Sequence, residues 1–369
     1  MNNVSIVGHG STKFSTEDLP IEDQMVNAVK NLFDNTKNLT QKDIDGVLVS
    51  TNNNSKYLAA IISEILGIEP NVSHTVESLC NSGTNAIVSG VAHIRSKIAK
   101  SILIIGGDRY DSPGQILEWD QARGEFKHPI FWASIFTNAY KRENNVKDEQ
   151  LALVSVKNYK NAKDKPNAYS DKIISVEDVL SSKKLTDDLR ILNCSRPCTG
   201  ASAILLTNDE SSKKFTDHPI KIQGIGQKSI SASFTNNPSL TNMNSTSIAS
   251  KIAFENAGWN PSDIDVLELH DAFSVCEPMA LESIGICVPG QGMSFLENLI
   301  KTNEKRVNPR GGLIGAGHPL GATGIAQTIE ITQQLQGTSG KRQTDSPKKG
   351  LVHNMSAAAT SSTILLLET

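Results

Sequence analysis

Two halves of the chain repeat the same series of motifs in the same order. Residues 4–8 and 220–224 each alternate like a β-strand and end in glycine. Each is followed by an amphipathic helical stretch, at 21–35 and at 245–257, and then by Asp-Ile-Asp before a short apolar strand. Strands that alternate with helices of this length are typical of buried strands between helical layers. Because the order is kept throughout, we predict a duplicated α/β unit.

The repeat also suggests where the chain divides. We expect an N-terminal half at 1–215 and a C-terminal half at 216–369. The stretch from about 109 to 192 has no counterpart in the second half and is polar and helix-rich, so we expect an inserted loop domain there. Residues 338–349 are polar and basic, which favours a solvated connection over a docking site for a phosphate-bearing ligand.

The charge and the cysteine content argue against several classes of protein. The chain has 36 Lys plus Arg and 39 Asp plus Glu, which gives a net charge of −3. This balance provides no overall positive potential that would attract nucleic acid or an anionic membrane. No apolar run approaches the ~20 residues of a membrane helix, and the first residues lack the pattern of a signal peptide. Five cysteines, an odd number in a long chain, indicate reduced thiols and a cytoplasmic location.

Cys80 lies where a predicted helix begins, because an apolar stripe at helical spacing follows it. Unpaired backbone N–H groups and the positive end of the helix dipole at such a place are expected to lower the pKa of a thiol and favour the nucleophilic thiolate. The alternative is a packed, inert cysteine that behaves as a small apolar residue.

A second candidate is His318, which lies in a stretch with six glycines in fourteen residues, 311–324. The glycine pattern fails as a dinucleotide fingerprint because position 320 is leucine. What remains is a histidine at a helix N-terminus, at the place that Cys80 occupies in the other half. A thiol and a histidine from two equivalent turns form the pair that nucleophilic acyl transfer needs.

Two more histidines follow predicted strands, where open α/β sheets collect active-site groups. His270 begins His-Asp-Ala-Phe, and His353 begins the terminal His-Asn-Met-Ser. The other cysteines and histidines are weaker candidates. Cys194 and Cys198 lack the further ligands of a zinc site, packing is the default for Cys276 and Cys287, and structural or exposed roles are expected for His9, His74, His93, His128 and His218.

Together, Cys80-Asn-Ser-Gly, His270-Asp-Ala-Phe, the Gly-His318-Pro loop and the terminal His-Asn-Met-Ser strongly resemble the thiolase superfamily. The likeness is to its sterol-carrier-protein-x-type and archaeal acetoacetyl-CoA thiolases, and it runs over essentially the whole chain. The resemblance implies a five-layered αβαβα fold from two duplicated halves, an inserted loop domain over a coenzyme A tunnel, and a homodimer or tetramer.

The resemblance also implies roles. Cys80 would take the acyl group as a thioester, His318 would activate it, and His270 would donate to the thioester oxygen. A second oxyanion hole would use backbone N–H groups of Cys80 and of the stretch Asn354 to Ser356. Many relatives place a second, acid/base cysteine in a Cys-x-Gly motif at that stretch or inside a His-Asp-Cys-Phe motif, and both are absent here. Cys276, His353 or His270 could move the α-proton instead.

These residues favour an acetyl-CoA C-acetyltransferase, which joins two acetyl-CoA by a reversible Claisen condensation into acetoacetyl-CoA and CoA through an acetyl-Cys80 intermediate. No cofactor or metal is expected. One alternative is a thiolase-fold acyltransferase for longer acyl-CoA or a non-CoA acceptor, and another is a non-catalytic subunit of a thiolase-containing complex. By resemblance, a small zinc-ribbon/OB-fold protein and hydroxymethylglutaryl-CoA synthase are candidate partners.

Overall fold

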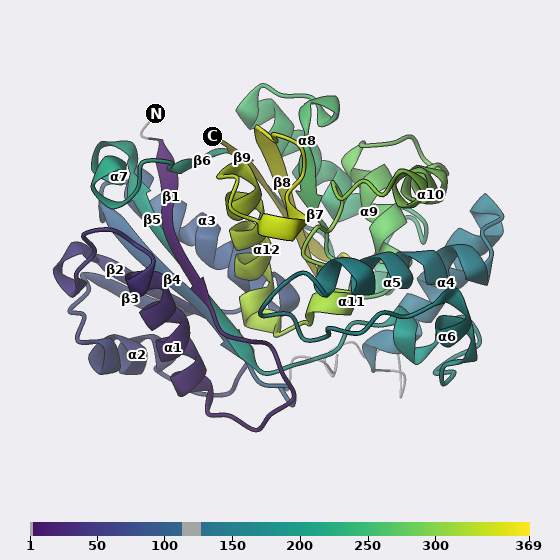
Figure 1. Cartoon of the computed structure of the whole chain (residues 1–369), viewed down its shortest axis with the longest axis horizontal. Coiled ribbons are helices and arrows are strands. Elements are labelled where there is room, and N and C mark those ends of the chain that lie inside the picture. Colours follow the sequence, from purple (N-terminus) through teal and green to yellow (C-terminus); the bar gives the residue numbers. More distant parts are fainter. Residues whose placement is uncertain (1–2, 113–126) are drawn as a thin grey trace.

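A computed structural model describes residues 3–112 and 127–369 of the chain. Its strands form one mixed sheet in the order β3-β2-β4-β5-β1-β6-β9-β8-β7 (Figure 1). The strands of the N-terminal half are β1 (Val4–Ser11), β2 (Gly46–Ser50), β3 (Val72–Val76), β4 (Ser101–Asp108) and β5 (Gly200–Asn208). Those of the C-terminal half are β6 (Ile220–Ser229), β7 (Val266–Glu268), β8 (Lys349–Ser356) and β9 (Ser361–Glu368).

The helices fall into three groups. The N-terminal half carries α1 (Ile21–Asp34), α2 (Leu58–Leu66), α3 (Ser82–Arg95) and α7 (Asp209–Phe215). The region between β4 and β5 carries α4 (Pro129–Asn144), α5 (Asp148–Ala162) and α6 (Val176–Ser181). The C-terminal half carries α8 (Asn244–Ala257), α9 (Cys276–Ile284), α10 (Gly292–Thr302), α11 (Gly312–Ala316) and α12 (Leu320–Leu335).

Strand pairing repeats between the halves. In the first, β2 runs parallel to β4, which is antiparallel to β5, which is antiparallel to β1. In the second, β7 runs parallel to β8, which is antiparallel to β9, which is antiparallel to β6. The halves join where β1 pairs with β6 through Ser5 and Ile6. The predicted α/β fold of two duplicated halves is therefore confirmed.

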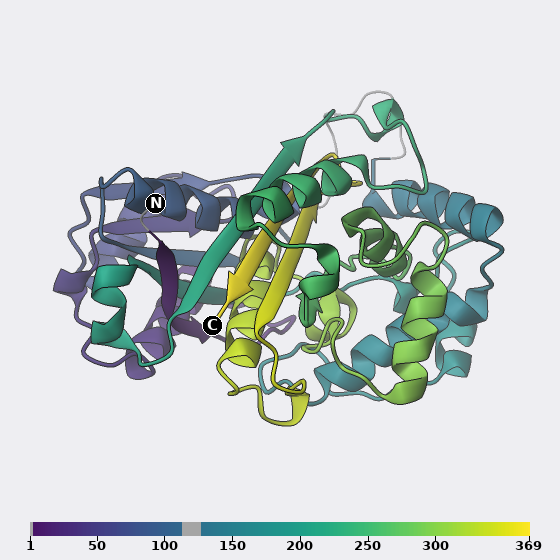
Figure 2. The same cartoon turned by 90° about the horizontal axis from the view of Figure 1, so that it is seen from above.

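The alternation of side chains along the strands creates the layers. In β4, Leu103 and Ile105 pack with α1 and α2, whereas Ile104 points into a central core with α3 and α12. In β9, Leu365 joins the same central core, whereas Leu366 packs with α8 and α9. Since successive strand residues face opposite sides of a sheet, α3 and α12 lie between the two groups of strands. Figure 1 shows α12 in this position, and Figure 2 shows the same arrangement from above.

Helices α3 and α12 touch backbone to backbone near their N-terminal ends. A Cβ atom on Gly83 would lie 2.8 Å from the carbonyl oxygen of Gly321, and one on Gly324 would lie 2.7 Å from the backbone nitrogen of Thr84. Real Cβ atoms do not come so close to other atoms, so only glycine permits this contact. Glycine at positions 83 and 324 thus brings the two helix N-termini together.

The region between β4 and β5 packs against the C-terminal half. Helix α5 contacts α10 and α11, as can be followed in Figure 1. Part of the predicted insertion, residues 113–126, lies outside the described residues. The basic loop at 338–349 is more than a solvated connection, because Arg342 is buried and pairs with Glu330 of α12 at 3.0 Å. No helix in the described part of the chain is both long and apolar enough to cross a membrane.

The contact between α3 and α12 can be tested by adding one methyl group. We expect Gly324→Ala to destabilise the protein by about 1–3 kcal/mol, because the backbone of Thr84 cannot move away. Gly90→Ala is the matched control in α3, where the atoms nearest to the new Cβ are side-chain methyl groups, those of Ile104, Leu206 and Ile102. Urea unfolding followed by circular dichroism measures both variants. Equal midpoints for the two would contradict the proposed role of Gly324.

Candidate active site

Cys80, His270 and His318 come together in one cavity. One side-chain donor atom of each residue lies within 4.8 Å of those of the other two. The two imidazole rings meet edge to face, with centroids 5.2 Å apart. All three residues line a cavity of about 320 Å³, which is the size of a small-molecule site. The structure thus gathers three residues that are far apart in the sequence.

A short helical turn, η2 (Leu79–Asn81), presents Cys80 directly before α3. Leu79 has a φ of 49°, a left-handed conformation that is unusual for a bulky residue. The hydroxyl of Ser82 holds this turn, since it donates to the Leu79 carbonyl at 2.6 Å and accepts from the Ser78 N–H at 2.8 Å. The hydroxyl of Ser356, at the end of β8, donates to the Ser78 carbonyl at 2.5 Å. Contacts from both halves therefore fix the turn that carries Cys80.

Hydrogen bonds define which nitrogen of His318 can accept a proton. The Nδ1 atom of His318 lies 2.7 Å from the hydroxyl oxygen of Thr323. That hydroxyl donates its own proton to the carbonyl of Pro319 at 2.9 Å. Nδ1 must therefore be the N–H donor of the pair, which leaves Nε2 unprotonated in the neutral ring. Nε2 is the nitrogen that can act as a base.

A short extended segment holds the two histidines at a fixed separation. The backbone N–H of Ser195 donates at 2.8 Å to the carbonyl of Ala272, which lies two residues after His270 in the chain. On its other side, the backbone N–H of His318 donates to the carbonyl of Arg196 at 3.0 Å. This segment, which contains Ser195 and Arg196, lies before β5 and belongs neither to the loop of His270 nor to the loop of His318. Its backbone thus acts as a spacer between the two catalytic loops.

Each half has a buried carboxylate that holds the start of a helix. Asp108, at the end of β4, accepts from the backbone N–H of Gly321 at 2.6 Å and of Asn52 at 3.0 Å. Asp271, next to His270, accepts from the backbone N–H of Leu313 at 2.6 Å. Burial raises the pKa of both carboxyl groups above the usual range. The sequence analysis assigned no role to either residue, although Asp108 ends a buried strand and Asp271 lies three residues after one.

The protonation of the pair differs from the expectation. Burial, with a smaller effect of Asp108, raises the pKa of the Cys80 thiol to about 12. Burial, with a smaller effect of Arg310, lowers the pKa of His318 to about 3. The prediction of a lowered thiol pKa was therefore wrong, because loss of water outweighs the helix dipole. At neutral pH the pair is a neutral thiol beside a neutral imidazole.

The remaining predicted residues lie outside this cavity or at its edge. Cys276 is buried at the start of α9, and the Nε2 atom of His353 lies 3.1 Å from the Thr246 hydroxyl oxygen. Neither lines the cavity. The side-chain amide of Asn354 donates to Gln327 at 2.6 Å, inside the central layer. Of the three acid/base candidates, only His270 is placed to meet a substrate, and its Nδ1 atom has no hydrogen-bond partner in the described residues.

Several cavity residues were missed or undervalued by the sequence analysis. Cys194, assessed only as a zinc ligand, lines the cavity, and so do Arg196, His128 and Trp132. The only described group of three or more metal-ligand residues is Cys80, His270 and His318, a thiol and imidazole set of a kind that zinc can bind. No periodicity in the sequence could reveal these neighbours, because they come from separate elements that meet only in the folded chain.

The comparisons with known proteins match both halves of the chain to family models. Residues 4–191 match the family model described as "Thiolase, N-terminal domain", and 226–369 match "Thiolase C-terminal domain-like". An acetyl-CoA acetyltransferase of Methanothermobacter thermautotrophicus is 30% identical, over 96% of this chain and 96% of that protein. Sterol carrier protein 2 of Oryctolagus cuniculus is 31% identical, over 76% of this chain and 55% of that protein.

Solved structures share the fold at lower identity. A structure described as "Ltp2-ChsH2(DUF35) aldolase" has a TM-score of 0.88 and 22% identity, covering 100% of this chain and 98% of that one. Human mitochondrial 3-ketoacyl-CoA thiolase has a TM-score of 0.78 and 18% identity, with coverages of 100% and 99%. At these identities the likeness concerns the fold alone.

Alkylation of Cys80 tests its protonation. Only a thiolate reacts with iodoacetamide, so a thiol with a pKa of about 12 should react slowly at pH 7, and its rate should rise about tenfold per pH unit up to pH 9. The adduct is measured on the peptide that carries Cys80, with Cys80→Ser as the control for that peptide. A rate that levels off below pH 8 would show the lowered thiol pKa that the structure argues against.

Proposed function

Because this chain belongs to the thiolase family, we propose that it is an acetyl-CoA C-acetyltransferase that works through an acyl-Cys80 intermediate. The observation that carries the proposal is the assembly of Cys80, His270 and His318 around one cavity. The acetyl-CoA acetyltransferases among its relatives support the substrate, since one of them matches over nearly the whole chain. The reaction needs thioesters of coenzyme A as substrates and, we propose, no metal or other cofactor.

In the first step the Cys80 sulfur attacks the carbonyl carbon of acetyl-CoA, and its proton passes to Nε2 of His318. The bond between that carbon and the CoA sulfur breaks, and the proton leaves with CoA as the free thiol. The neutral thiol and imidazole suit this step, because a charged imidazole could not accept the proton. The product is acetyl-Cys80.

In the second step another acetyl-CoA loses an α-proton, and the resulting carbanion attacks the carbonyl carbon of acetyl-Cys80. A carbon–carbon bond forms, the bond to the Cys80 sulfur breaks, and the thiolate regains a proton. We propose that His270 donates to the thioester oxygen of this second substrate and stabilises its enolate, as the resemblance implies. The backbone at Cys80 and Ser356 would bind the oxygen of the acetyl-enzyme.

The group that takes the α-proton must reach the cavity. His270 was one candidate, but hydrogen bonding to the enolate oxygen already occupies it in this proposal. Cys194 is the second thiol that lines the cavity, and it pairs through its backbone with Phe273, in the same chain segment as His270. We therefore propose Cys194, in place of Cys276 or His353, as the acid and base at the α-carbon.

Assembly and location are further parts of the proposal. A homodimer or tetramer is expected for this family, and a solved neighbour described with a DUF35 protein supports a small zinc-ribbon/OB-fold partner. A complex with hydroxymethylglutaryl-CoA synthase is proposed from the resemblance alone. All five cysteines are free, which supports a reducing, cytoplasmic location. The alternative of a non-catalytic subunit is disfavoured, because the thiol and both histidines are present and in contact distance.

Removing the nucleophile should abolish the reaction. We expect Cys80→Ala to lower kcat for thiolysis of acetoacetyl-CoA by on the order of 10⁴-fold or more. Wild-type protein mixed with acetyl-CoA should gain one acetyl group on the peptide that carries Cys80. Cys287→Ala, which removes a half-buried thiol outside the cavity, is the control and should keep both properties. Retained activity in Cys80→Ala would contradict the nucleophile assignment.

Proton exchange identifies the second acid and base. We expect Cys194→Ala to slow the exchange of acetyl-CoA α-protons with deuterated water by on the order of 10²-fold or more, while Cys80 is still acetylated. Cys276→Ala is the matched control, a buried cysteine outside the cavity, and should exchange at the wild-type rate. NMR of the recovered acetyl-CoA follows the exchange. Normal exchange in Cys194→Ala would exclude Cys194 and leave the role to His270.

A further inference from the structure

Arg196 lines the cavity and is a cation that has no counter-charge among the described residues. It is half-buried, and its guanidinium has no hydrogen bond or ion pair with any described residue. The other described arginines that are not fully exposed have such partners. They are Arg109 with Asp18 and Asp111, Arg190 with Ser182, Arg306 with Ile264, Arg310 with Glu268, and Arg342 with Glu330. Arg95 and Arg142 are exposed.

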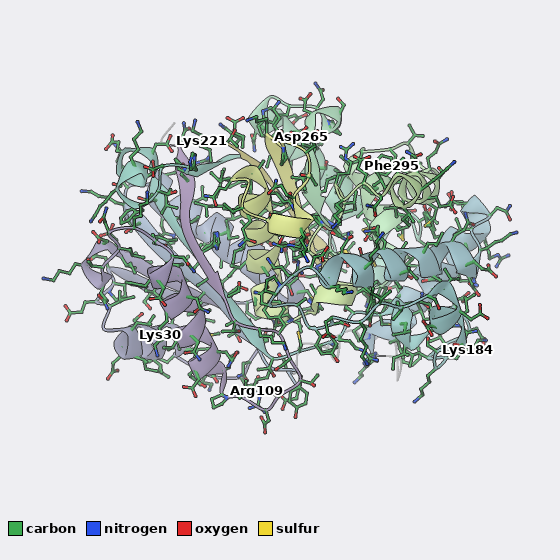
Figure 3. The ribbon with its side chains drawn as sticks, in the orientation of Figure 1. Lys30, Arg109, Lys184, Lys221, Asp265 and Phe295 are labelled. Atoms are coloured by element: carbon green, nitrogen blue, oxygen red, sulfur yellow. The ribbon has the colours of Figure 1, made fainter. Side chains whose placement is uncertain are left out.

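The cavity itself supplies no anion for Arg196. Its described lining contains no aspartate or glutamate and is mostly apolar, with Trp132, Leu185, Ile191, Phe273, Leu320 and Met355 among its residues. The guanidinium is close enough to Cys194 to lower the pKa of that thiol, against the larger rise that burial causes. Basic residues elsewhere, such as Lys30 and Lys184, lie at the periphery of the molecule, where water solvates them (Figure 3). A partly buried charge is costly unless it is paired, and no described residue pairs with Arg196, so its N–H donors are open to an anionic ligand.

We propose that this chain acts on acyl groups that carry a terminal carboxylate, and that Arg196 binds this carboxylate through two parallel N–H···O bonds. The inference rests on the proposed thiolase function and names a substrate class for its cavity. An acetyl group carries no negative charge that could pair with this guanidinium. A guanidinium fits a carboxylate in a planar, two-point contact, which gives both affinity and direction.

The position of Arg196 favours the acyl end of the substrate over the phosphates of coenzyme A. The Arg196 carbonyl accepts from the backbone N–H of His318 at 3.0 Å, so the guanidinium lies within one arginine side chain of the catalytic histidine. The arm of coenzyme A between its sulfur and its diphosphate is more than twice as long as that side chain. An anion held by Arg196 therefore lies a few carbons from the reacting carbonyl.

Thiolysis runs the two steps of the proposed condensation in the reverse direction. In thiolysis of a 3-oxo-dicarboxylic acyl-CoA, the Cys80 sulfur bonds to C3 and the bond between C2 and C3 breaks. Its electron pair stays on C2, which takes a proton and leaves as acetyl-CoA. A carboxyacyl group remains on Cys80, with its carboxylate on Arg196. The thiol of free CoA then attacks this group, which gives the mono-CoA ester of a shorter dicarboxylic acid and restores the Cys80 thiol.

Two substrates of equal length test the proposal. 3-Oxoadipyl-CoA and 3-oxohexanoyl-CoA both have six-carbon acyl groups, but only the first carries a terminal carboxylate. We expect the wild type to prefer 3-oxoadipyl-CoA in kcat/KM by roughly 10-fold to 100-fold, the effect of a charged hydrogen bond. Arg196→Gln should reduce this ratio to about one. Arg142→Gln, which changes an exposed arginine of α4, should leave the ratio at the wild-type value.

A binding measurement distinguishes failure of this inference from failure of the proposed function. Calorimetry with Cys80→Ala compares succinyl-CoA with butyryl-CoA, which also differ only in the carboxylate, and needs no turnover. Tighter binding of succinyl-CoA that Arg196→Gln removes supports the inference even if no thiolysis is found. Equal binding of the two ligands would overturn it. If Arg196→Gln weakens both esters equally but not their phosphate-free pantetheine analogues, the cation binds coenzyme A phosphate and the inference is wrong.

Discussion

The backbone contact between α3 and α12 is the constraint on which the site depends. Cys80 precedes one helix and His318 precedes the other, and glycine at positions 83 and 324 lets the two helix starts approach at a distance no side chain would allow. Asp108 reinforces the contact, since it ends a strand of one half and accepts from the first turn of α12. The duplicated fold thus places its two equivalent turns face to face across the central layer, where they build one site.

Enclosure of that site decides its chemistry. Packing between the layers buries His318 and partly buries Cys80, which raises the pKa of the thiol and lowers that of the imidazole. Both groups stay neutral, and Thr323 fixes the imidazole tautomer that leaves Nε2 open. Proton transfer between them then has to accompany attack on a thioester. A charged pair formed in advance would need solvation that the cavity does not offer.

Much of this site could be predicted from the sequence, because its central residues stand at repeated strand and helix ends. Cys80, His318 and His270 were found in this way, and they contact one another. Cys194 and Arg196 were not, since they belong to a connecting segment whose pattern carries no period. Their position follows from two backbone hydrogen bonds, one to each histidine loop. Such contacts join residues that are distant in sequence, and nothing local in the chain encodes them.

The sequence by itself determined the duplicated α/β unit, the order of its strands and helices, and the residues able to carry acyl transfer. These follow from local patterns of apolar, glycine and polar residues, and such patterns act over a few positions. Only the tertiary structure decided which polar groups lose water and which charges find partners. It reversed the expected direction of the pKa shift of Cys80, placed Cys276 and His353 outside the cavity, and left Arg196 without a partner among the described residues. Burial of a side chain and pairing of a charge are properties of the packed chain, because residues from several layers together surround each group.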